Sequence, residues 1–67
     1  MRREDPFPGI GKAEMRARID NARLDDQDAV IAELALIRGM DFAEIAPYAI
    51  CSRSTVSRHY HKIIKQI

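Results

Sequence analysis

The chain has 67 residues, of which 46% are hydrophobic and 31% are charged. This composition is typical of a folded globular domain, and the length allows one domain with one small core. The single cysteine excludes an internal disulfide, and no apolar run approaches the roughly 20 residues that a membrane-spanning helix needs. The N-terminal sequence MRREDPFPG has no apolar stretch after it, unlike a secretory signal. We therefore expect a cytoplasmic protein with no membrane partner.

The net charge of +1 is distributed unevenly along the chain. Residues 1–50 hold seven Lys or Arg and ten Asp or Glu, whereas residues 51–67 hold four Lys or Arg and no acid. A local basic stripe is sufficient to neutralise phosphates, whatever the charge of the whole chain. The distribution thus favours a nucleic-acid ligand at the C-terminal segment, and a solvated charged helix face is the alternative.

An irregular arm and a first helix are expected at the N-terminus. Residues 1–11 contain two prolines and two glycines, which favour a mobile segment without regular structure. A helix is predicted over residues 12–24, because Met15, Ile19 and Ala22 recur at the spacing of one helical face.

A second helix is predicted over residues 26–38. Asp25 is suited to cap its N-terminus and Gly39 to end it. Asp28, in the first turn, places a negative charge at the positive end of the helix dipole. The residues expected to form its apolar face are Val30, Ile31, Leu34 and Ile37.

A third, short helix is predicted over residues 42–49. Asp41 followed three residues later by Glu44 resembles a capping box. Pro47 lies inside this helix and is expected to kink or shorten it, because proline removes one backbone hydrogen bond. The residues expected to point inward are Phe42, Ile45, Ala46 and Ala49.

A fourth helix is predicted over residues 53–66, with Ser52 as its N-cap. Its inner face is expected to hold Val56, Tyr60, Ile63 and Ile67, which recur at helical spacing. The opposite face then collects Ser54, Arg58, His61 and Lys65, with Thr55, Ser57 and Lys62 at its edges.

Residues 41–60 thus read as a capped helix, a tight turn and a second capped helix. This is the pattern of a helix-turn-helix, whose second helix lies in the DNA major groove. We expect an all-α fold, a small four-helix domain over residues 12–67 that contains this motif. Arg58 and Arg53 are suited to read guanine or to hold phosphates. The expected DNA-binding residues are Arg53, Ser54, Thr55, Ser57, Arg58, His61, Lys62 and Lys65.

Residues 24–59 carry a family resemblance. They read LDDQDAVIAELALIRGMDFAEIA and, after the turn, SRSTVSRH. This pattern resembles the domain that reads the −35 promoter element in sigma factors of the sigma-70 class. The resemblance implies a helix-turn-helix fold and binding of double-stranded DNA. A complete sigma factor needs further domains, so the chain is expected to be a small regulator that uses this module.

The turn departs from that family. The family usually has Leu-Gly-Ile there, whereas this chain has Ala49, Ile50 and Cys51. Glycine is favoured because the turn can require a positive φ, which is costly for a β-branched residue. The sequence therefore predicts either a reshaped turn or a strained Ile50.

The function expected from these features is that of a sequence-specific DNA-binding transcriptional regulator. Two alternatives stay open. The acidic residues outside the fourth helix suit a protein-interaction module that docks on RNA polymerase or on a sigma or anti-sigma partner. The same fold also suits the DNA-targeting module of a mobile-element protein. A homodimer is a further open alternative, in which Ile64 and Ile67 form the contact instead of covering the core.

No enzyme, cofactor or metal site is expected. Cys51, His59 and His61 are candidate metal ligands, but the two histidines are two residues apart and point to different sides of a helix. No pair of carboxylates suggests a catalytic pocket, and so short a chain offers little room for a cleft.

Overall fold

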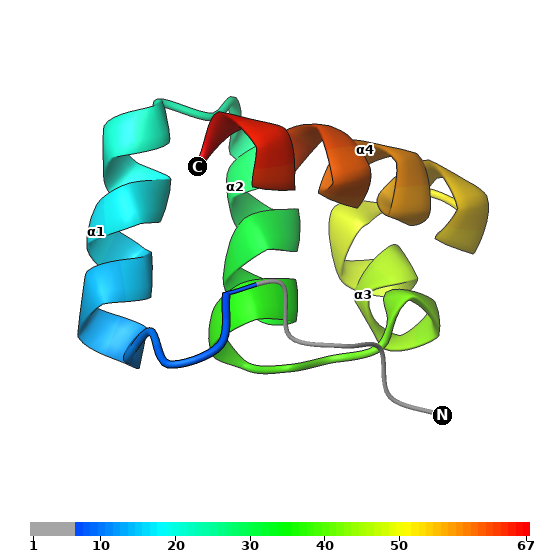
Figure 1. Ribbon diagram of the computed structural model, residues 1–67. Coiled ribbons are helices and arrows are strands. Elements are labelled where there is room, and N and C mark those ends of the chain that lie inside the picture. Colours follow the sequence, from blue (N-terminus) through cyan, green and yellow to red (C-terminus); the bar gives the residue numbers. More distant parts are fainter. Residues whose placement is uncertain (1–6) are drawn as a thin grey trace.

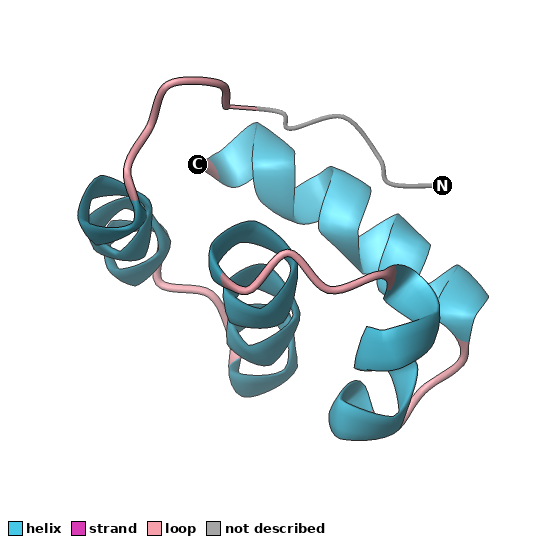
Figure 2. Ribbon diagram, turned by 90° about the horizontal axis from the view of Figure 1, so that it is seen from below, coloured by secondary structure: helices cyan, strands magenta, loops and turns pink. Residues whose placement is uncertain are grey.

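The computed structural model describes residues 7–67. All regular structure in this range is helical, which confirms the all-α prediction. Two helices lie side by side, a third lies beyond them, and the last crosses one end of the group (Figures 1 and 2). No helix in residues 7–67 is long and apolar enough to cross a membrane. The elements are α1 (Lys12–Ala22), α2 (Asp26–Ala32), η1 (Glu33–Ile37), α3 (Phe42–Ala49) and α4 (Arg53–Gln66).

The first two helices differ from the expected ranges. α1 ends two residues early because Arg23 adopts a left-handed backbone, with φ 54° and ψ 49°. The helix expected over 26–38 consists of α2 followed by the π-helical turn η1, in which the Arg38 N–H donates to the Glu33 carbonyl at 3.1 Å. Gly39 then takes a φ of 69°, which ends the helix as expected.

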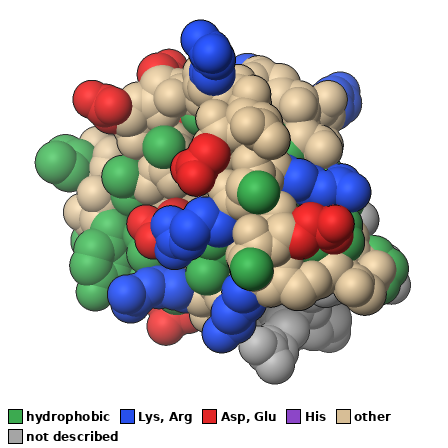
Figure 3. Space-filling model, turned by 90° about the vertical axis from the view of Figure 1, so that its left-hand side faces the viewer, with side chains coloured by type: hydrophobic (Ala, Val, Ile, Leu, Met, Phe, Trp, Pro, Cys, Tyr) green, Lys and Arg blue, Asp and Glu red, His purple; other side chains and the backbone are tan. Residues whose placement is uncertain are grey.

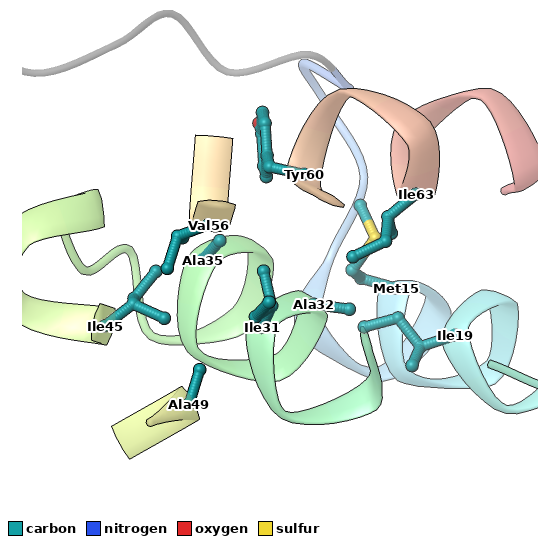
Figure 4. Packing of buried hydrophobic residues seen from close by; sticks show 10 residues of the cluster. All are labelled: Met15, Ile19, Ile31, Ala32, Ala35, Ile45, Ala49, Val56, Tyr60 and Ile63. Carbon is teal, nitrogen blue, oxygen red and sulfur yellow. The ribbon is translucent and has the colours of Figure 1, made fainter. Parts of the chain in front are cut away.

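The core draws on all four helices (Figure 4). Ile31, Ile45, Val56 and Ile63 are its largest fully buried side chains. The aromatic rings of Phe42 and Tyr60 pack together with their centroids 5.1 Å apart. The buried hydrophobic residues are Met15, Ile19, Ile31, Ala32, Ala35, Ile45, Ala49, Val56, Tyr60 and Ile63.

The buried face of α2 and η1 includes the expected Ile31, with Leu34 and Ile37 partly buried against the core, but it does not include Val30. Val30, expected in the core, is 38% exposed, whereas Asp28 is only 3% exposed. Asp28, Ile31, Ala32 and Ala35 are spaced three, one and three residues apart, so they share one helical face. An aspartate therefore occupies the first position of the buried face.

The segment before α1 packs on the domain. Phe7 and Ile10 lie against the core, and the Ile10 N–H donates to the Phe7 carbonyl at 3.3 Å. The Arg18 guanidinium lies 5.9 Å from the centre of the Phe7 ring. This part of the expected irregular arm is thus held in place, and residues 1–6 of the arm lie outside the described range.

Candidate nucleic-acid interface

α3 has the expected bounds, 42–49, and contains Pro47. At its N-terminus the Asp41 N–H donates to Glu44 Oε1 at 3.0 Å, as in a capping box. At its C-terminus the Ala49 carbonyl accepts a hydrogen bond from Gln27 Nε2 at 3.1 Å. Because Gln27 belongs to α2, this bond fixes the end of α3, and hence the start of the turn, to the scaffold.

The turn between α3 and α4 is tight, and Ile50 adopts a left-handed backbone in it. This residue adopts φ 54° and ψ 50°, in the left-handed region that favours glycine. The Ile50 N–H donates to the Ala46 carbonyl, and the Cys51 N–H donates to the same oxygen at 3.1 Å. Of the two predicted outcomes, the strained residue is therefore observed. The Ile50 side chain is 89% exposed, so its own packing does not explain this conformation.

α4 begins at Arg53 because Ser52 caps it. Ser52 Oγ accepts a hydrogen bond from the Thr55 N–H at 3.2 Å. It also lies 3.0 Å from Thr55 Oγ1 in a second hydrogen bond. The Thr55 hydroxyl, expected to contact DNA, is thus engaged in the cap, while its residue is half-buried.

The other predicted DNA-binding residues gather on the outer side of α4. Val56, Tyr60 and Ile63 face the core, which turns the opposite side of the helix to solvent. Ser57 is half-buried at the edge of this outer side. The exposed members of the predicted set are Arg53, Ser54, Arg58, His61, Lys62 and Lys65.

His61 is held in one orientation on this face. Its Nδ1 lies 2.8 Å from the Ser57 carbonyl oxygen. Since a carbonyl only accepts, Nδ1 carries the proton of this bond. In the neutral ring the Nε2 atom is therefore an acceptor, and in the charged ring it is a second donor.

The surface over α1 carries charges of both signs (Figure 3), unlike the outer side of α4. On this side of the molecule Lys, Arg, Asp and Glu side chains are interspersed with hydrophobic ones (Figure 3). One such pair joins Arg16 of α1 to Glu33 of η1, with 2.9 Å between nitrogen and oxygen. α4 contains no acidic residue, so its exposed charges are all positive.

Lys62 is also part of an ion-pair cluster that the sequence did not reveal. The Asp28 side chain is only 5% exposed, and its Oδ2 lies 2.9 Å from Lys62 Nζ. Its Oδ1 lies 2.6 Å from His59 Nδ1. Asp28 lies in the first turn of α2, as expected, but it is buried, and Lys62 has an internal partner. The spacing of Asp28 relative to Ile31 and Ala35 was the only local signal of its burial.

The cluster changes the proton affinity of its members. Burial raises the pKa of the Asp28 carboxyl, but the hydrogen bonds and positive charges of His59 and Lys62 outweigh this effect, and the pKa lies below its ordinary value. The Asp28 carboxylate in turn raises the pKa of Lys62. Asp28 is therefore a carboxylate at neutral pH, and Lys62 is an ammonium.

Cys51 is a free, half-buried thiol. In residues 7–67 no three His, Cys, Asp or Glu side chains are grouped so that they could hold a metal ion. Comparisons with protein-family models, curated proteins and solved structures find no match to this chain.

Proposed function

We propose that α3, the turn and α4 form a helix-turn-helix, and that the protein is a sequence-specific DNA-binding transcriptional regulator. The observation that carries this proposal is the outer side of α4, where cations and a hydroxyl are exposed without any acid. Such a surface can neutralise phosphates and can approach base edges closely. The likeness of residues 24–59 to the −35-reading domain of sigma-70-class factors supports the same function.

In the proposed complex the N-terminal half of α4 enters the major groove. Arg58 and Ser54 are one helical turn apart on the exposed side, so they reach neighbouring positions along the groove. Arg58 is suited to bind O6 and N7 of guanine with its two terminal nitrogens. Arg53 lies at the start of α4, and His61 and Lys65 lie further along it than Arg58; these three residues bind phosphates.

The acidic remainder of the chain supports a defined orientation on DNA. Residues 1–50 hold more acids than bases, whereas residues 51–67 carry only positive charges at neutral pH. Phosphates repel the first segment and attract the second, so the field of the protein turns α4 towards the duplex.

Selection of bound duplexes from a random library tests this proposal. We expect a reproducible motif whose affinity falls steeply with salt. Arg58→Ala should lose discrimination between the motif and a scrambled duplex by roughly 5- to 150-fold, the value of one bidentate base contact. Arg38→Ala is the matched control, because it removes the same charge from an exposed residue outside α4. Equal binding by the two variants, with helical content intact, would contradict the assigned reading surface.

A second candidate function is docking on a protein partner such as RNA polymerase or a sigma or anti-sigma factor. It is favoured by Tyr48 and Ile50, two large hydrophobic residues that are 66% and 89% exposed at the end of α3. If no duplex is selected and the protein retains a polymerase subunit only when Tyr48 and Ile50 are intact, this second function replaces the first.

A further inference from the structure

Asp28 is the one buried charged residue among those that the structure describes. It lies in α2, and both of its partners lie in α4, three residues apart. Each carboxylate oxygen holds one partner: Oδ1 contacts His59 and Oδ2 contacts Lys62. The buried Val56, Tyr60 and Ile63 fix which side of α4 faces the core. The two contacts on one carboxylate add a polar restraint on the rotation of α4 and on its position along α2.

We propose that Asp28 is a positioning residue for DNA binding, which restrains the rotation of α4 and keeps the Lys62 ammonium away from DNA phosphates. This inference rests on the proposed function. It assigns Lys62 a role opposite to the one that the sequence suggests, because the Lys62 ammonium, although its side chain is 52% exposed, is paired with the buried Asp28 carboxylate. Lys62 is one helical turn from Arg58, so without Asp28 it would join the DNA-facing cations.

The burial of Asp28 favours its pairing with Lys62. The Asp28 side chain is nearly buried, and a buried carboxylate that loses its partner keeps the full penalty of desolvation. A DNA phosphate that attracted Lys62 would have to overcome this penalty, whereas Lys65 pairs with no described acid and is free to bind a phosphate. His59 is less exposed than Lys62, and it holds the second oxygen in place.

The first experiment compares the salt dependence of duplex binding for Lys62→Ala and Lys65→Ala. Each phosphate contact contributes a slope of about 0.9 in log K against log salt for duplex DNA. We expect Lys65→Ala to lower the slope by about 0.9 and Lys62→Ala to leave it unchanged. If Lys62→Ala lowered the slope of log K against log salt as much as Lys65→Ala does, Lys62 would be shown to bind a phosphate. This result would overturn the inference.

The second experiment releases Lys62. Asp28→Asn retains the shape of the side chain but loses its charge, and Asp26→Asn removes the same charge from an exposed position on the same helix. Relative to Asp26→Asn, we expect Asp28→Asn to steepen the slope by about 0.9. We also expect discrimination against a scrambled duplex to fall about tenfold, as one base contact is misaligned. Adding Lys62→Ala to Asp28→Asn should remove the extra slope.

Binding is measured at a temperature below the thermal unfolding midpoint of every variant, and circular dichroism checks that each variant keeps its helical content. A loss of stability therefore does not by itself change the slope of log K against log salt. If wild type binds duplexes but Asp28→Asn and Asp26→Asn have equal slopes, the positioning role is wrong and the DNA-binding function stands. If wild type binds no duplex, the proposed function fails and the positioning role fails with it.

Discussion

Replacing Ile50 with glycine should stabilise the protein, although it removes a large hydrophobic side chain. The left-handed backbone costs an L-residue roughly 1–2 kcal/mol, which glycine avoids. Ile50 is 89% exposed, so the burial lost is about a tenth of the ~1.5–3 kcal/mol for a fully buried side chain, or about 0.2 kcal/mol. Glycine also makes the unfolded chain more flexible, at a cost of roughly 0.5–1 kcal/mol.

The sum of these three effects is an increase of about 0.5 kcal/mol in the free energy of unfolding for Ile50→Gly. For a domain of this size, that corresponds to an increase of about 3 °C in the midpoint of thermal unfolding. Thermal and urea unfolding followed by circular dichroism measure both quantities. Arg23→Gly is the matched control, because Arg23 has φ 54° and ψ 49° but no branch at Cβ. It should gain less than Ile50→Gly. A lower midpoint for Ile50→Gly would refute the argument, since it would mean that the side chain stabilises the turn.

Two further predictions concern stability. Because the pKa of Asp28 is lowered below its ordinary 3.8 in the folded protein, Asp28 contributes stability above that value and loses it as the pH falls through the folded pKa. Urea unfolding from about pH 5 downward should therefore show a smaller loss of stability for Asp28→Asn than for wild type, and an equal loss would contradict the lowered pKa. Ser52→Ala should reduce the free energy of unfolding by about 1 kcal/mol, because the Thr55 N–H loses its acceptor. Ser52→Asp should restore most of this loss in the same urea assay, and failure to do so would mean that Ser52 acts through another contact.

The ranges of α3 and α4 could be predicted because their signals are local. Asp41 and Ser52 each precede a helix, and their caps involve residues three positions away. The buried side of α4 follows from the spacing of Val56, Tyr60 and Ile63 alone, which also determines the opposite side. The strained Ile50 was predictable as one of two outcomes, because a tight turn between these helices can require a positive φ there, and Ile50 has a φ of 54°.

The cluster around Asp28 could not be predicted from local signals. Asp28 and His59 are 31 residues apart in the chain, and a contact at that separation leaves no trace in helical spacing. Val30 is hydrophobic and adjacent to Ile31, so the sequence is compatible with two neighbouring buried faces of α2. The packing of α4 selects the face that contains Asp28, because His59 and Lys62 compensate its charge.

The four largest fully buried side chains, three isoleucines and one valine, are all branched at Cβ. In a helix such residues occupy one χ1 rotamer in about 90% of cases. The helical backbone therefore selects most of their side-chain conformation before the helices meet, and burying them costs less entropy than burying a flexible residue such as methionine. A chain with room for only one small core thus obtains a rigid one. Methyl-group order parameters should be high at these four positions and lower at Met15, which lies between α1 and the rest of the core.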